Sequence, residues 1–96
     1  MVTIDWTELA LEDLKEIHDY ISLDSKIYAD RYIGKLIARV DQLSTHPKSG
    51  RVVPEYHVDT IRELIEGNYR IVYKYHEQSI SILRIHHAAR LLKFLQ

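Results

Sequence analysis

Residues 61–75 read IRELIEGNYRIVYKY, and apolar and polar side chains alternate on both sides of Gly67-Asn68. A period of two is typical of strands that have one buried face. Glycine followed by asparagine suits a two-residue turn of type II′. The stretch therefore predicts a β-hairpin, and a second tight connection at residues 76–78 continues it into a third strand over residues 80–86.

Two amphipathic helices are predicted before the hairpin. Their apolar residues recur at steps of three and four, as a helix of about 3.6 residues per turn requires. The first stripe contains Ala10, Leu14, Ile17 and Ile21, broadened by Leu11 and His18, and the second contains Ala29, Tyr32, Ile33, Leu36, Val40 and Leu43. The short polar segment between them, residues 22–25, predicts an antiparallel helical hairpin. Pro47 requires the second helix to end before it.

Polar residues in front of each stripe predict where the helices begin. Thr7 or Asp5 can cap the first helix, and Asp5 with Glu8 has the spacing of a capping box. Asp24 or Ser25 can cap the second helix. Both alternatives stay open from the sequence alone.

The first residues of the chain predict one more strand, because Val2, Ile4 and Trp6 alternate with polar residues. The expected fold class is α+β in the order β-α-α-β-β-β, with the two-helix hairpin packed on one face of a small antiparallel sheet. The length predicts that residues 1–96 form a single domain. The expected core consists of Ile4, Trp6, Leu14, Ile17, Ile33, Leu36, Val40, Ile71 and Tyr73.

The sheet face turned away from the helices is not explained by a plain two-layer domain. If the tyrosines of residues 69–75 face the helices, the other face of that strand carries Arg70, Val72 and Lys74. In the simplest register the neighbouring strands add Arg62, Leu64, Ile80, Ile82, Arg84 and His86 to it. Scattered apolar side chains are normal on a surface, but a face that mixes them with cations favours a docking surface for another chain.

The composition excludes several classes of protein. Of 96 residues, 46% are apolar and 28% charged, and no stretch reaches the roughly 18 apolar residues of a membrane span. The chain has no cysteine and does not begin like a secretory signal, so we expect a cytoplasmic protein without disulfides or thiolate metal sites. A net charge of −1 weighs against binding nucleic acid mainly through its phosphates.

Three motifs in the C-terminal half carry a resemblance to a known family. They are HPKSGR at residues 46–51, RELIEGNYRIVY at residues 62–73 and ILRIHHAAR at residues 82–90. In this order and spacing, and after a β-α-α opening, they resemble the RelE/ParE superfamily. The resemblance covers nearly the whole chain.

The resemblance implies a growth-inhibiting toxin that a small cognate antitoxin neutralises in a toxin–antitoxin hetero-oligomer. RelE-like members cut mRNA on the ribosome, whereas ParE-like members inhibit DNA gyrase without known catalysis of their own. The run His86-His87-Ala88-Ala89-Arg90 is more similar to the ParE-like branch. We therefore expect a gyrase inhibitor. The alternatives are a RelE-like ribosome-dependent mRNA endonuclease and an inactive relative that binds only an antitoxin.

Cleaving RNA through its 2′-hydroxyl requires a base, a cation and an acid. The resemblance implies Arg70 as the cation and Glu55 as the base. RNA-cutting relatives usually carry a His or Tyr near the position of Ala88 and Ala89, which transfer no proton. His87 completes the set if the protein is a nuclease; otherwise we expect no catalytic residue, and in either case no cofactor and no metal.

Several charged residues have more than one interpretation. Arg70 and Glu63 form a cross-strand ion pair, make capping contacts at the hairpin, or lie on opposite faces. Arg90 caps strand-end carbonyls or contacts the target. His86 and His87 are neighbours on a strand, so they point to opposite faces and do not share a metal ion. The residues expected to contact the target or the antitoxin are Arg62, Leu64, Arg70, Val72, Lys74, Arg84, His86 and Arg90.

Overall fold

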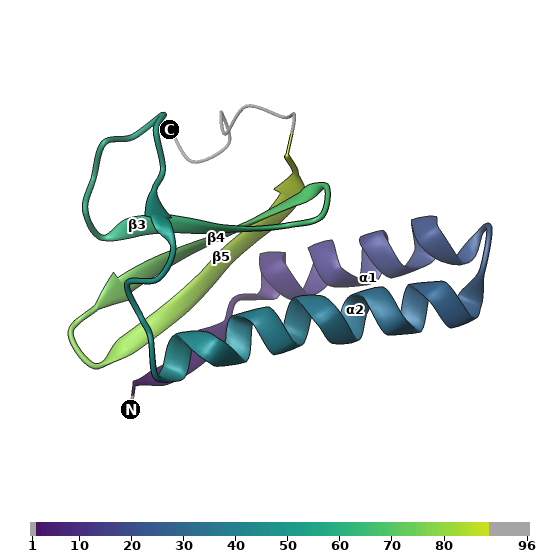
Figure 1. Ribbon diagram of the computed structural model, residues 1–96, viewed down its shortest axis with the longest axis horizontal. Helices are drawn as coiled ribbons and strands as arrows, with labels where there is room; N and C mark the ends of the chain where they lie inside the picture. The colour runs from purple at the N-terminus through teal and green to yellow at the C-terminus, as the bar shows by residue number, and fades with distance from the viewer. Residues whose placement is uncertain (1, 89–96) are drawn as a thin grey trace.

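A computed structural model describes residues 2–88. In chain order its elements are β1 (Thr3–Trp6), α1 (Glu8–Ser22), α2 (Lys26–Asp41), the short 3-10 helix η1 (Gln42–Ser44), β2 (Arg51–Val52), β3 (Ile61–Glu66), β4 (Tyr69–His76) and β5 (Ser79–His87). The two long helices lie side by side along one face of the sheet (Figure 1). Within residues 2–88, no helix is long and apolar enough to cross a membrane.

The sheet has five strands in the order β1-β5-β4-β3-β2. β3, β4 and β5 form the predicted antiparallel meander. β1 pairs with β5 in the parallel direction, so the sheet is mixed rather than wholly antiparallel. The α+β class and the helical hairpin on one face are confirmed. The direction of β1 and the two-residue strand β2 were not predicted, because alternation does not encode direction and two residues show no period.

The register places several side chains on the opposite face from the one expected. The two-residue turn pairs Leu64 with Ile71 and Arg62 with Tyr73, so Leu64 and Arg62 share the helix side of the ladder. Leu64 is buried in the main core. The prediction that these two residues lie on the outer face of the sheet is therefore wrong.

A bulge between β4 and β5 corrects the other half of that prediction. Val72 pairs with Arg84 but Tyr73 pairs with Ile82, so β5 carries one extra residue at Leu83. The extra residue reverses the alternation along β5. Ile80 therefore lies in the helix-side core together with Ile82, not on the outer face.

Gly67 sets the tight turn between β3 and β4. Its φ is +58°, whereas Asn68 has no positive φ, as a type II′ turn requires. A Cβ atom at Gly67 would collide with the hydroxyl of Tyr32, which donates a hydrogen bond of 2.8 Å to the Glu66 carbonyl. Glycine is required here both for the backbone conformation and for space.

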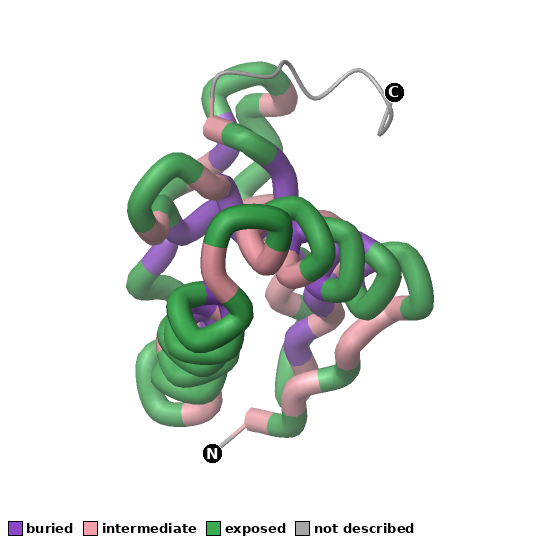
Figure 2. The backbone as a smooth tube through the Cα atoms, turned by 90° about the vertical axis from the view of Figure 1, so that its right-hand side faces the viewer, coloured by how far each residue is buried: buried purple, intermediate pink, exposed green. Residues whose placement is uncertain are grey.

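The main core lies between the helical hairpin and the sheet (Figure 2). Six of the nine predicted core residues are buried in it: Leu14, Ile17, Leu36, Val40, Ile71 and Tyr73. Ile4, Trp6 and Ile33 are partly buried and pack against the same cluster. Leu11, which was expected to broaden the buried stripe of the first helix, is exposed instead.

The helix caps settle the alternatives left by the sequence. Thr7 caps α1 by accepting from the Ala10 amide, and its hydroxyl donates to the Ile82 carbonyl at 2.7 Å. Ser25 caps α2 by accepting from the Tyr28 amide. The Thr7 hydroxyl thus ties the start of α1 to β5.

Candidate functional site

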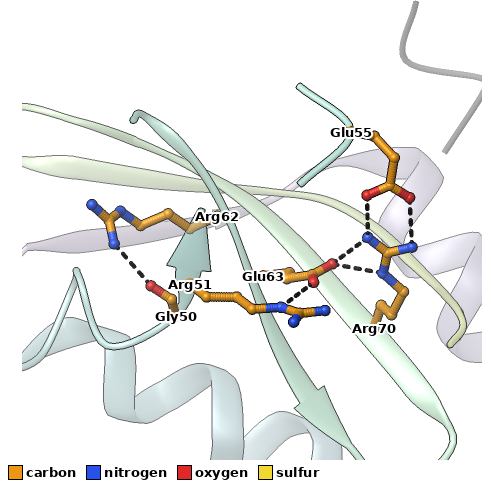
Figure 3. Close-up of polar contacts among 6 residues, drawn as sticks. All are labelled: Gly50, Arg51, Glu55, Arg62, Glu63 and Arg70. Carbon is orange, nitrogen blue, oxygen red and sulfur yellow. Dashed lines mark hydrogen bonds and ion pairs between the residues drawn. The ribbon is translucent and has the colours of Figure 1, made fainter. Parts of the chain in front are cut away.

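Four charged side chains form a chain of ion pairs on the sheet face that the helices do not cover (Figure 3). This charge cluster consists of Arg51, Glu55, Glu63 and Arg70. Both terminal nitrogens of Arg70 donate to Glu55, Nη1 to Oε2 and Nη2 to Oε1, each at 2.9 Å. The Nε atom of Arg70 donates to Oε1 of Glu63 at 2.6 Å.

Glu63 is the centre of the charge cluster. Its side chain has 0% exposure, and its second oxygen accepts from Nε of Arg51 at 2.6 Å. The ion pair between Arg70 and Glu63 is thereby confirmed, because Glu63 lies opposite Val72 and so shares a face with Arg70. The hydrogen bonds to Glu55 are the largest cause that raises the pKa of Arg70 above its ordinary value. The guanidinium is therefore charged at any working pH.

A second ion pair joins the sheet to α1. Arg84 donates from Nε and Nη2 to the carboxylate of Asp13, at 2.8 and 3.0 Å. The Ile85 amide donates to the same carboxylate at 2.9 Å. Asp13 was not among the predicted residues, although a charged residue inside the apolar stripe of α1 was the available signal.

The two histidines of β5 lie on opposite faces of the sheet. His86 is buried opposite Arg70, whereas His87 is exposed opposite Tyr69, whose ring meets it edge-on at 5.7 Å between centroids. Among the three residues that a nuclease would use, Glu55 and Arg70 are brought together and His87 is not. Within residues 2–88, no three side chains of the metal-binding types gather in one place.

The remaining predicted contact residues are dispersed. Val72 is buried beside Val53, and Lys74 is exposed on the same outer face, opposite Ile61. Arg62 donates to the Gly50 carbonyl at 2.9 Å and to Asp59 at 2.8 Å. Arg90 lies outside the described residues. A contact of any of them with a partner stays a prediction.

An aromatic hollow that the sequence reading missed lies between the helical hairpin and the turn from β3 to β4. Its volume is about 420 Å³, and it is lined by Tyr20, Ile21, Tyr28, Tyr32, Gly67, Asn68, Tyr69 and His87. The tip of the helical hairpin, where α1 turns into α2 beside this hollow, carries large apolar side chains that are exposed to solvent. Tyr20 is 70% exposed and Leu23 82%, and Ile27 and Tyr28 are exposed as well. The clustering of these residues around the predicted loop was a usable signal.

The fold is shared with chains of solved toxin–antitoxin complexes. A chain of the structure described as the chromosomal ParDE TA system from P. aeruginosa matches with a TM-score of 0.75 and 27% identity, over 91% of this chain and 96% of that one. A chain of the toxin–antitoxin complex RelBE2 from Mycobacterium tuberculosis has the same fold, with a TM-score of 0.65 and 20% identity over 90% and 96% of the two chains. The class is that of the ParE/RelE toxins.

The chain belongs to the family of ParE toxins of type II toxin-antitoxin systems (parDE), whose model matches residues 4–92. It is 38% identical to the toxin RelE2 of Caulobacter vibrioides over 92 residues, which are 95% of this chain and 100% of that protein. It is 33% identical to the putative toxin Y4kP of Sinorhizobium fredii over 86 residues, 88% of this chain and 86% of that one. The resemblance to the RelE/ParE superfamily is confirmed.

Proposed function

We propose that this type II toxin acts in the cytoplasm by binding and inhibiting DNA gyrase, and that its cognate antitoxin holds it inactive in a hetero-oligomer. One observation carries the choice of an inhibitor over a nuclease. The Nε, Nη1 and Nη2 groups of Arg70 all donate to carboxylates of the chain itself, those of Glu63 and Glu55.

A nuclease needs Arg70 to face a phosphorane and Glu55 to face a ribose hydroxyl. Here both oxygens of Glu55 accept from Arg70, so the base and the cation face each other. His87, the remaining candidate, lies on the other side of the sheet. These placements support a protein whose activity resides in contacts.

The uncovered hairpin tip supports a binding partner. Tyr20, Leu23, Ile27 and Tyr28 gather around one short loop beside the aromatic hollow. Large apolar side chains clustered in this way mark an interaction surface more often than singly scattered ones do. An antitoxin segment that is disordered alone and orders on binding can cover such a surface.

Inducing the toxin in cells and following plasmid supercoiling and protein synthesis together tests this function. We expect negative supercoiling to fall before translation slows, and co-expressed antitoxin to prevent both. Translation that stops first, with supercoiling unchanged, would contradict gyrase as the target. Growth and both readouts unaffected at full expression would instead identify an inactive relative.

A further inference from the structure

The two carboxylates bound to Arg70 differ in how firmly the fold holds them. Glu63 lies on β3 with 0% side-chain exposure. Glu55 lies in the loop between β2 and β3, and its side chain is 24% exposed. Glu63 therefore fixes the direction of the guanidinium, while the more exposed Glu55 covers its two terminal nitrogens and leaves only 7% of the Arg70 side chain exposed.

The pair between Glu55 and Arg70 has the geometry of a bound ligand. Two parallel N–H···O bonds of 2.9 Å join the fork of the guanidinium to both oxygens of one carboxylate. Any carboxylate presented at the same place would make the same two bonds. The position is a carboxylate site that the chain fills itself.

The loop that carries Glu55 is anchored on both sides of that residue, because Val53 is fully buried, Tyr56 packs against it and Asp59 pairs with Arg62 of β3. It follows a strand of only two residues, and His57 within it has a φ of +53°, a conformation that costs free energy outside glycine. Val58 and Asp59 are exposed. The Glu55 side chain is 24% exposed, so a change of its rotamer releases Arg70 while the loop, Glu63 and β3 stay in place.

We propose that Arg70, oriented by Glu63, is a carboxylate-binding site, and that an acidic side chain of the bound antitoxin replaces Glu55 there. The inference rests on the proposed function for the identity of the partner. Arg51, whose side chain is 62% exposed, lies at the other end of the charge cluster and attracts the same acidic segment. Lys74 on the same face does so as well.

A carboxylate suits this site better than a phosphate. Glu63 stays beside the guanidinium after Glu55 has left, and its negative charge disfavours an incoming dianion more than a monoanion. The chain as a whole carries a net charge of −1 and provides no broad basic field for nucleic acid. The expected ligand is thus an aspartate or glutamate of a protein segment.

Glu55 competes with an outside carboxylate for Arg70. Its removal is therefore expected to change the affinity for the partner in the direction opposite to that of an ordinary contact residue. A group tethered by a short loop has an effective concentration of about millimolar at its site. An outside carboxylate binds only to the fraction of molecules in which Glu55 is away. Removing Glu55 should therefore strengthen binding of the partner, whereas removing an ordinary contact residue weakens it.

The first experiment needs no antitoxin. Propionate, a monoanion that carries the carboxylate of a glutamate side chain, is titrated into the isotope-labelled toxin while the Nε–H signal of Arg70 is followed by NMR. We expect a weak shift in wild type and a saturable shift at about tenfold lower concentration in Glu55→Ala. Asp59→Ala is the matched control, because it removes one acid from the same loop that pairs with Arg62 instead. Equal titrations of wild type and Glu55→Ala would overturn the site.

The second experiment measures the affinity of the purified antitoxin for each variant. We expect Glu55→Ala to bind about tenfold more tightly and Arg70→Lys to bind more weakly, with thermal unfolding confirming that both fold. Unchanged or weaker binding by Glu55→Ala overturns the exchange. A single-stranded oligonucleotide that shifts the Arg70 signal more than propionate does overturns the choice of a carboxylate. If propionate binds Glu55→Ala and no antitoxin binds any variant, the proposed partner is wrong and the site stands.

Discussion

The Asp13 carboxylate on α1 satisfies two groups at the edge of β5 that no neighbouring strand reaches. It accepts from the Arg84 guanidinium and from the Ile85 amide. β1 pairs with β5 only as far as Ile82, so beyond that residue the helix supplies the partner. The Asp13 side chain thus supplies the hydrogen-bond acceptor that a neighbouring strand would otherwise supply.

Replacing Asp13 with alanine should destabilise the fold by about 2–4 kcal/mol. The change leaves Arg84 without its carboxylate and a buried amide without an acceptor, and the partial exposure of Arg84 keeps the cost below that of a fully buried pair. Urea unfolding measures this loss of stability. The control is Glu16→Ala, which removes an exposed acid from the same helix and should change the free energy of unfolding by less than about 0.5 kcal/mol. Equal midpoints for the two variants would contradict the role of Asp13.

Asp30 on α2 provides a prediction about pH. Its hydrogen bond with His18 is the first of the causes that lower its pKa below the ordinary value of 3.8, followed by the hydrogen bond from Lys26. Because the pKa of Asp30 is lower in the folded state than in the unfolded state, the pairing stabilises the fold at any pH above the unfolded-state pKa. This stabilisation is lost as the pH falls through the folded-state pKa. NMR titration of the Asp30 carboxyl should show a midpoint that rises in His18→Ala. A midpoint that does not move would exclude His18 as the main cause.

At the scale of elements, the turn between β3 and β4 depends on one glycine. Gly67→Ala should cost about 1–3 kcal/mol, because the residue has a left-handed φ and its Cβ would meet the Tyr32 hydroxyl. Gly34 is the matched control: it is exposed within α2 with nothing within 4 Å of a Cβ, so Gly34→Ala should stabilise by about 0.5–1 kcal/mol. Thermal unfolding of both variants checks the signs, and two changes of the same sign would contradict one of the two assignments.

The hairpin tip carries the prediction about the partner. Leu23→Ser and Ile27→Ser should each weaken the antitoxin complex by about tenfold while changing the stability of the free toxin by less than about 0.5 kcal/mol. Leu9→Ser is the control, since Leu9 is exposed near the opposite end of α1. Affinity that falls equally in the control would mean that the tip is not the docking surface.

For the whole molecule, the sequence predicted what local pattern encodes. The two helical stripes, the hairpin around Gly67 and most of the core followed from periodicity and turn chemistry. The bulge at Leu83 was not predicted, because the expected register assumed that side chains alternate without interruption along β5. One extra residue reverses that alternation. That single residue explains why Ile80 and Ile82 were assigned to the wrong face.

The charge cluster was predicted only in part. Arg70 and Glu55 were singled out through the family resemblance, and their bidentate pairing was not foreseen, because the loop that brings Glu55 over β4 has no period to follow. Asp13 and the aromatic hollow arise from contacts between helix and sheet that are distant in sequence. Such contacts depend on register, which alternation alone leaves undetermined.

Adding the purified toxin to a gyrase supercoiling assay and to a ribosome assay that follows mRNA cleavage tests most directly whether it acts by contact or by catalysis. We expect supercoiling to stop at a toxin concentration that rises in proportion to the gyrase present, since an inhibitor is consumed one for one, while the mRNA stays whole. Ribosome-bound mRNA cut many times per toxin molecule, with supercoiling untouched, would contradict the assignment.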